Sequence, residues 1–73
     1  MHYSEYISIN PSIRFGKPCI TGTRISVYDV LGWLSSGMTT NDIKVDFPQL
    51  NSDQIFACMA YAADKERKVI LSD

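Results

Sequence analysis

The sequence is poor in the residues that build metal centres and catalytic sites. Its 73 residues include one histidine, His2, and two cysteines, Cys19 and Cys58, which lie far apart in the chain. A structural zinc site needs four cysteine or histidine ligands, or carboxylates in their place, at close spacing. No acidic pair is placed to share a proton, and neither cysteine has a base nearby in the sequence. We therefore expect no metal, no cofactor and no enzymatic activity.

The chain also lacks long apolar runs and any excess of positive charge. Its N-terminus has no basic segment followed by an apolar stretch, and no run approaches the length of a membrane span. We expect a soluble, cytoplasmic protein with no membrane partner. The net charge is −1, whereas dedicated nucleic-acid binders tend to show a basic face on a basic domain. DNA binding would therefore need a dimer or a second protein.

A chain of this length forms one domain, residues 1–73, with a small core. Small domains are usually stabilised by disulfides, a metal or a partner chain. The two cysteines are best explained as small buried hydrophobes in a reducing compartment, although the sequence leaves a disulfide between them open. Oligomerisation is then the expected stabilisation, and we predict a homodimer or a larger assembly.

Two parts follow each other along the chain and predict a small, mostly α-helical α+β fold. Residues 1–24 form an extended or β arm that ends in a glycine-rich joint, and residues 25–68 form a three-helix bundle. Within the arm, apolar and polar residues alternate at 6–9 and at 13–15, on either side of a turn signal at 10–12. These segments form a short hairpin or two separate extended pieces.

The C-terminal tail, residues 69–73, follows the bundle. It begins with the apolar run Val69-Ile70-Leu71. This run is either a final strand or an extension of the last helix that is used in an interface.

Each of the three expected helices begins with the spacing of a capping box, in which two side chains bond each other's backbone amides. The pairs are Ser26 with Asp29, Thr39 with Asp42, and Asn51 with Gln54. In the third helix, the spacing of apolar residues predicts a core stripe of Ile55, Phe56, Met59, Ala60 and Ala63. The same helix is expected to turn toward solvent the residues Asn51, Gln54, Ala57, Cys58, Tyr61 and Lys65.

The second and third helices, joined by a short turn, have the layout of a helix-turn-helix. The third helix is then the candidate recognition helix, since Asn and Gln side chains can pair with adenine and lysines can meet phosphates. The predicted DNA-binding residues are Lys44, Asn51, Gln54, Tyr61 and Lys65. Polar residues on an outer helix face are more often simply solvated, and Asp53 at the start of this helix would repel DNA.

The joint between arm and helices, Gly16 to Arg24, is mainly a matter of backbone geometry. It is not a phosphate-binding P-loop, because Lys17 sits at the wrong end and is followed by Pro18. Glycines 16 and 22 are expected to supply positive φ, and Thr23 a local hydrogen bond in the turn. Arg24 has two open roles: a structural pair with a carboxylate such as Asp29, or insertion into an acidic site on a partner.

Twelve residues of this region also carry a family resemblance: Gly16, Lys17, Pro18, Ile20, Gly22, Thr23, Arg24, Ile25, Val27, Gly37, Pro48 and Leu50. In this pattern the chain resembles the family known as domain of unknown function 433 (DUF433), described as VapB-like antitoxins with a helix-turn-helix. The resemblance covers about residues 7–63. It implies a bacterial or archaeal antitoxin-like protein that binds and neutralises a small toxin, often with a PIN-like nuclease fold, and that also binds operator DNA as a dimer.

Besides the DNA-binding set, the predicted partner-binding residues are Lys17, Arg24, Trp33, Arg67 and Lys68. Trp33, together with Tyr28, lies off the main apolar stripe of the first helix. Both are either partly buried against the strands or form a contact patch for a second protein. The alternative to the antitoxin interpretation is a homodimeric interaction module whose helix-turn-helix is only a scaffold, with no role in DNA binding.

Overall fold

A computed structural model describes residues 3–71 of the chain, and the side chains of residues 3–65. Its arm contains two single-turn 3₁₀ segments and two short strands: η1 (Tyr3–Glu5), β1 (Ile7–Ser8), η2 (Arg14–Gly16) and β2 (Cys19–Ile20). Three helices follow: α1 (Val27–Ser35), α2 (Thr40–Asp46) and α3 (Ser52–Leu71). The predicted fold class is confirmed: a small α+β domain in which an antiparallel hairpin precedes three helices.

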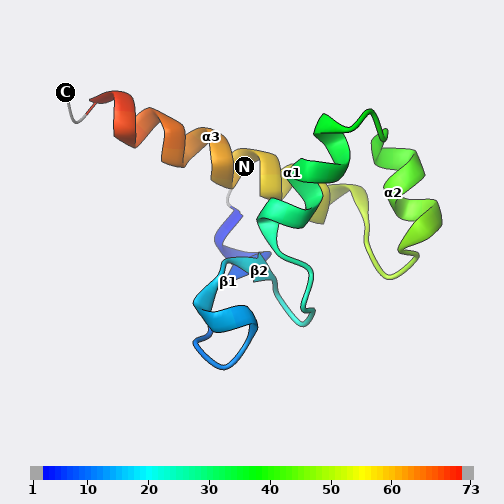
Figure 1. Cartoon of the computed structure of the whole chain (residues 1–73), viewed down its shortest axis with the longest axis horizontal. Helices are drawn as coiled ribbons and strands as arrows, with labels where there is room; N and C mark the ends of the chain where they lie inside the picture. Colours follow the sequence, from blue (N-terminus) through cyan, green and yellow to red (C-terminus); the bar gives the residue numbers. More distant parts are fainter. Residues whose placement is uncertain (1–2, 72–73) are drawn as a thin grey trace.

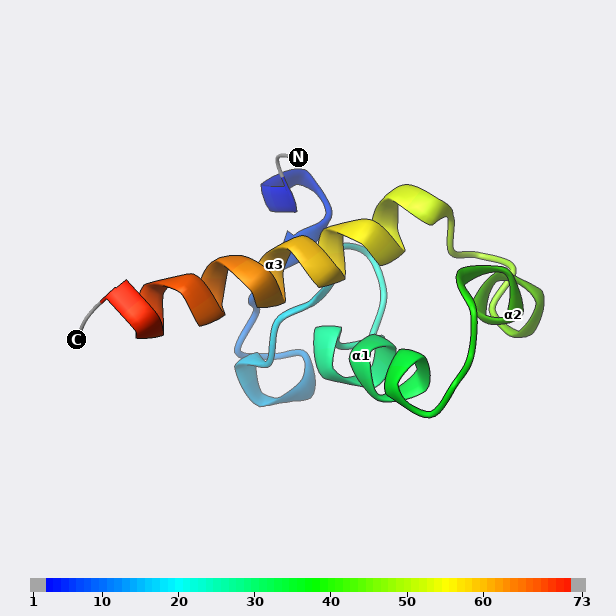
Figure 2. The same cartoon turned by 90° about the horizontal axis from the view of Figure 1, so that it is seen from above.

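The helices α1 and α2 and the hairpin are arranged around the long helix α3. Figure 1 shows α3 along the upper edge, α1 crossing close to it, α2 at one end and the hairpin below α3. The view from above places the loop around η2 beside the start of α1, away from α2 (Figure 2), where Arg14 contacts Asp29. None of the described helices is long and apolar enough to cross a membrane.

The strand pairing differs from the prediction. Strand β1 pairs with β2 through Ile7 opposite Ile20 and Ser8 opposite Cys19, and residues 13–15 are not a strand. The turn at Asn10 leads into the η2 loop and not directly into a second strand. The Asn10 carbonyl accepts from the Ile13 amide at 2.8 Å, and the Asn10 side-chain oxygen accepts from the Ser12 amide at 2.9 Å. The strand that pairs with β1 therefore lies after the η2 loop, at Cys19–Ile20.

The predicted starts of all three helices are confirmed. The Ser26 hydroxyl accepts from the Asp29 amide and the Asp29 carboxylate from the Ser26 amide, both at 3.0 Å. Thr39 and Asp42 make the same reciprocal pair at 3.1 and 2.9 Å. Asn51 and Gln54 do so at 2.9 and 2.8 Å, so each helix begins where its cap residue predicts.

The buried face of α3 was predicted only in part: Ile55 is fully buried and Met59 packs against the core, as expected. Ala57 and Cys58, expected in solvent, are fully buried, whereas Phe56 is 45 % exposed and Ala63 is exposed. The reason is that α3 is contacted by α1 and also by η1 and β1. The residues buried on α3 are Ile55, Ala57 and Cys58, and they meet a core that includes Ile20, Val27, Val30 and Ile43.

The C-terminal apolar run is a helix extension, since α3 continues to Leu71. The last turns of α3 extend beyond the other elements (Figures 1 and 2). Of the two readings of this segment, a final strand is therefore excluded.

Candidate protein-binding surface

The backbone of the joint is fixed by its own hydrogen bonds. Gly16 and Gly22 have φ of 82° and 81°, as predicted. The Thr23 hydroxyl donates to the Ile20 carbonyl at 2.8 Å and accepts from the Ile25 amide at 3.0 Å, which confirms its role in the turn. The chain itself thus orders the backbone of the joint, without a partner.

Arg14, and not Arg24, makes the structural ion pair that the sequence left open for Arg24. The Nη1 atom of Arg14 donates both to the Asp29 carboxylate, at 3.0 Å, and to the Arg24 carbonyl, at 2.9 Å. This pairing ties the η2 loop to the first turn of α1. The Asp29 carboxylate also takes the Ser26 amide, so it serves the helix cap and the loop at once.

The titration of Asp29 reflects these contacts. Partial burial acts to raise the pKa of its carboxyl, but the hydrogen bonds from Ser26 and Arg14 and the Arg14 charge outweigh it. The pKa of Asp29 therefore lies below its ordinary value of 3.8. The group stays ionised at neutral pH, which keeps the loop attached.

Two cations of the joint remain available to a partner. The side chains of Lys17 and Arg24 are exposed, and neither makes a hydrogen bond or ion pair with another residue of the described part of the chain. Arg24 contributes only its carbonyl oxygen to the internal contacts, by accepting from Arg14. The Arg24 side chain therefore does not form the structural pair with Asp29 that the sequence left open.

Phe15 stands two residues before Lys17, in a segment that the sequence predicted to be extended. Its side chain is 99 % exposed. Arg14, Phe15 and Gly16 follow one another in the left-handed region, with φ of 51°, 59° and 82°. A non-glycine residue held there costs about 1–3 kcal/mol, and a phenyl ring left in water forgoes a further 1.5–3 kcal/mol or so of burial.

One sequence signal could have revealed this loop. The turn signal at Asn10-Pro11 and the glycine at 16 bracket a segment too short for a second strand plus its turns. Phe15, placed directly before Gly16, then falls at the tip of a loop and not in a sheet.

Each predicted DNA-binding residue is engaged within the chain. Asn51 and Gln54 bond each other's amides in the capping box, and the Lys44 amine donates to the Ser52 hydroxyl at 3.0 Å. Tyr61 packs against the core, and the Lys65 amine donates to the Tyr28 hydroxyl at 3.3 Å. The structure brings Tyr61 and Lys65 together, but it leaves Asn51, Gln54 and Lys44 at the other end of α3.

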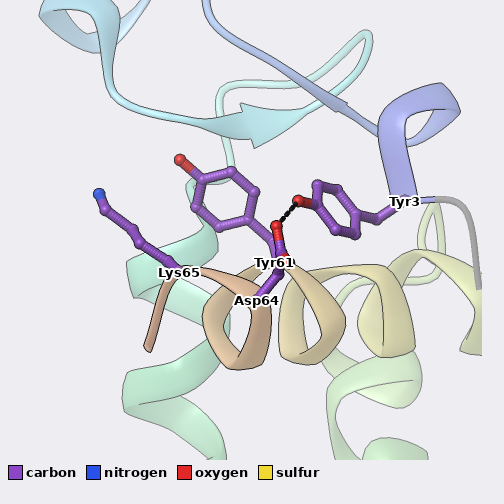
Figure 3. A pocket seen from close by; sticks show the side chains of 4 residues that line it. All are labelled: Tyr3, Tyr61, Asp64 and Lys65. Atoms are coloured by element: carbon purple, nitrogen blue, oxygen red, sulfur yellow. Dashed lines mark hydrogen bonds between the residues drawn. The ribbon is translucent and has the colours of Figure 1, made fainter. Parts of the chain in front are cut away.

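Tyr61 and Lys65 line a shallow pocket with Tyr3 and Asp64, of about 260 Å³. The rings of Tyr3 and Tyr61 meet edge to face, with centroids 5.5 Å apart and planes at 82°. Figure 3 shows the Tyr61 ring between the Tyr3 ring and the Lys65 amine, which lies 5.9 Å from the Tyr61 centroid. No sequence pattern indicates this pocket, because Tyr3 and Asp64 are 61 residues apart.

Hydrogen bonds set the charge states around the pocket. The Tyr3 hydroxyl donates to the Asp64 carboxylate at 2.5 Å, and this bond raises the pKa of Tyr3 above 10.0. The bond to Tyr28 raises the pKa of Lys65 above 10.5. At neutral pH Tyr3 is therefore a neutral phenol, and Lys65 places an ammonium group at the edge of the pocket.

The remaining predicted partner-binding residues fall in two groups. Trp33 is half-buried and stacks on Phe47, with centroids 4.4 Å apart, so it packs against the end of α2 and not against the strands. Arg67 and Lys68 lie on α3, and their side chains are outside the described residues. Tyr28, by contrast, is 49 % exposed and lies close to the pocket through Lys65.

The two cysteines are free thiols, and both are buried. Burial raises the pKa of the Cys58 thiol to about 11, so this residue is a protonated, inert hydrophobe. The question of a disulfide is thereby answered in the negative. Among the described residues, no group of three or more histidine, cysteine or acidic side chains is placed to hold a metal ion.

Comparison with known proteins identifies the family but no activity. A family model described as "Protein of unknown function (DUF433)" matches residues 7–62. The "Uncharacterized protein y4eO" of Sinorhizobium fredii is 31 % identical over 58 residues, which are 80 % of this chain and 26 % of that protein. The chain thus spans about a quarter of that relative's length.

The fold has also been seen in a crystal structure. A DUF433 member protein from Anabaena variabilis superposes with a TM-score of 0.81 at 20 % identity, covering 94 % of this chain and 68 % of that one. At this identity the likeness shows the shared fold alone.

Proposed function

The chain belongs to the DUF433 family, whose function is unknown, and from that premise we propose that it is an antitoxin-like protein-binding module of the cytoplasm. Its partner is a small nuclease toxin that presents clustered carboxylates. The contact is made by Arg24, with Lys17 beside it in the joint. The module itself carries out no chemical step.

The observation that carries this proposal is the free guanidinium of Arg24 on a fixed backbone. Asp29, the carboxylate that could have held it, is already paired with Arg14. An arginine fork matches carboxylates well, and a metal-dependent nuclease uses such carboxylates to hold its catalytic ion. A guanidinium placed among them competes with the metal. Because the joint is ordered in advance, little freedom is lost on binding.

The arrangement of α3 favours protein binding over base reading. The polar side chains predicted to contact DNA bond to other residues of the same chain, and Ala57 and Cys58 turn inward. Operator binding is accordingly the subordinate part of the proposal. A gel shift against the region upstream of the gene tests it, and binding through lysines would fall steeply as salt increases.

The main test is co-expression with the small protein encoded beside this gene. The wild-type chain should relieve the growth arrest that this protein causes, and Arg24→Ala should abolish the relief. Lys44→Ala is the matched control, because it removes a cation remote from the joint. Circular dichroism shows whether each variant is folded. Full neutralisation by folded Arg24→Ala would refute the proposal, and so would failure of the wild-type chain to neutralise.

A further inference from the structure

The most unusual surface feature that the proposed function leaves unused is the tip of the η2 loop. Phe15 is 99 % exposed, so its ring touches almost nothing in its own chain. The backbone around it is held left-handed at Arg14, Phe15 and Gly16, and Arg14 anchors the loop to Asp29 and to the Arg24 carbonyl. Strain of this kind persists only where other contacts enforce it, and it marks functional positions. The fold therefore presents this ring to the outside as a rigid knob.

The same chain contains a pocket suited to an aromatic ring. The pocket lined by Tyr3, Tyr61, Asp64 and Lys65 measures about 260 Å³. A protein cavity of about 150 Å³ accommodates benzene, so a phenyl group fits. Tyr3 and Tyr61 already meet edge to face, the arrangement that a third aromatic ring can extend. The Lys65 ammonium at the edge adds a cation for the face of that ring.

Knob and pocket both lie in the part of the domain away from α2. Both the η2 loop and the second half of α3 are remote from α2 in two perpendicular views (Figures 1 and 2). In Figure 3 the residues that line the pocket lie between the hairpin and α3. Two copies related by a twofold axis can make both contacts at once, because the Phe15 knob of each copy then meets the pocket of the other.

We infer that Phe15 of one copy inserts between Tyr3 and the Lys65 amine of a second copy, over the Tyr61 ring, and that the contact is reciprocal. A second copy is the fitting occupant because both halves of the contact belong to this chain. A domain of this size also has little core of its own and gains most from a partner chain. The inference is independent of the toxin contact, which uses Arg24 and Lys17.

Charge separates this dimer contact from the toxin contact. Arg14 is neutralised by Asp29, and the pocket carries one carboxylate and one ammonium group, Asp64 and Lys65. The contact is mainly between aromatic rings. The dimer should therefore persist from about 50 to about 500 mM salt, whereas a contact through free surface cations is screened over that range.

Sedimentation of the full chain tests the inference. The wild-type chain should dimerise at micromolar concentration, and Phe15→Gly should weaken dimerisation by about thirtyfold or more, as loss of a central aromatic anchor does. Glycine suits the left-handed backbone, so this variant keeps its fold. Val45→Ala is the matched control: it trims another exposed apolar side chain, 70 % exposed, on α2 at the far end. It should leave dimerisation unchanged.

Cross-linking shows whether the two parts meet between copies. A Phe15→Cys chain mixed with a Lys65→Cys chain should give a disulfide-linked pair on mild oxidation, and the native cysteines do not interfere because both are buried. A monomeric wild-type chain, a Phe15→Gly variant that dimerises normally, or the absence of this linked pair each overturns the inference. None of these results affects neutralisation through Arg24, so the two proposals fail separately.

Discussion

The sequence predicted partner-binding residues in the joint and DNA-binding residues in α3. In the structure these two sets of side chains differ in whether they are already bonded within the chain. In the joint, the backbone is bonded internally and the cations Lys17 and Arg24 are left exposed. In α3, the polar side chains are bonded internally and the predicted outer face is partly buried. A polar residue type thus identifies a binding site only when its hydrogen bonds are not already made within the chain.

The largest expected effect concerns the orientation of α3. Ala57→Asp should place an unpaired charge in the core and destabilise this small domain by more than about 4 kcal/mol, enough to abolish its cooperative melt. Ala63→Asp, the same change on the exposed face of the same helix, should shift stability by about 0.5 kcal/mol or less. Thermal unfolding followed by circular dichroism compares the two. A larger loss of stability for Ala63→Asp than for Ala57→Asp would mean that α3 faces the core as the sequence alone predicted.

The next effect separates Arg14 of the η2 loop from Arg24 of the joint. Arg14→Ala should destabilise the fold by about 1 kcal/mol, since it removes a charge-assisted hydrogen bond that is partly exposed to solvent. Arg24→Ala should change stability by about 0.5 kcal/mol at most, because its side chain has no partner among the described residues. Urea unfolding of both variants gives these differences. A larger loss for Arg24→Ala would return that residue to a structural role.

Left-handed backbone gives effects of similar size but opposite sign on stability at Gly22 in the joint and at Phe15 in the η2 loop. Gly22→Ala should destabilise by about 1 kcal/mol, because φ is 81° and an added Cβ meets nothing within 4 Å, which leaves only the conformational cost. Phe15→Gly should stabilise the monomer by a comparable amount, about 1 kcal/mol, by relieving a left-handed phenylalanine. Melting temperatures measured at concentrations where the chain is monomeric test both. A destabilised Phe15→Gly monomer would show that the ring supports its own fold.

The smallest effect is the acid sensitivity of the loop attachment. The pKa of Asp29 is lower in the folded chain than its ordinary value of 3.8, so its contribution to stability is fully present above that value. It is lost as the pH falls through the lowered pKa, because the unfolded chain then binds the proton more readily. Melting temperatures of the wild type and Asp29→Asn between pH 2 and 6, roughly the span of that titration, should differ at the upper end and converge at the lower. A constant difference would exclude this carboxylate as the cause.

Local features of the fold were predictable because each depends on residues a few positions apart. The three capping boxes, the turn at Asn10 and the positive φ of Gly16 and Gly22 all follow from such short-range chemistry. The family resemblance likewise rests on a contiguous pattern, and the match to residues 7–62 confirms membership. The antitoxin role that was attached to the resemblance stays a proposal.

The orientation of α3 could not be read from the sequence for a specific reason. Residues 55–60, Ile-Phe-Ala-Cys-Met-Ala, are all apolar, so helical periodicity offers several faces of similar hydrophobicity. The choice among them is made by what packs on the helix. Here α1 and the arm segments η1 and β1 approach it, and together they select Ile55, Ala57 and Cys58.

The sequence by itself determined where each helix starts, how the joint turns, and which cations the joint carries. Only the tertiary structure decided that Arg14 pairs with Asp29, that Arg24 is left free, and that Phe15 stands in water. It also created the pocket, by bringing Tyr3 to Asp64 across 61 residues. The physical reason is the same in each case: capping and turn preferences act between near neighbours, whereas burial and pairing depend on segments that meet only after the chain has folded.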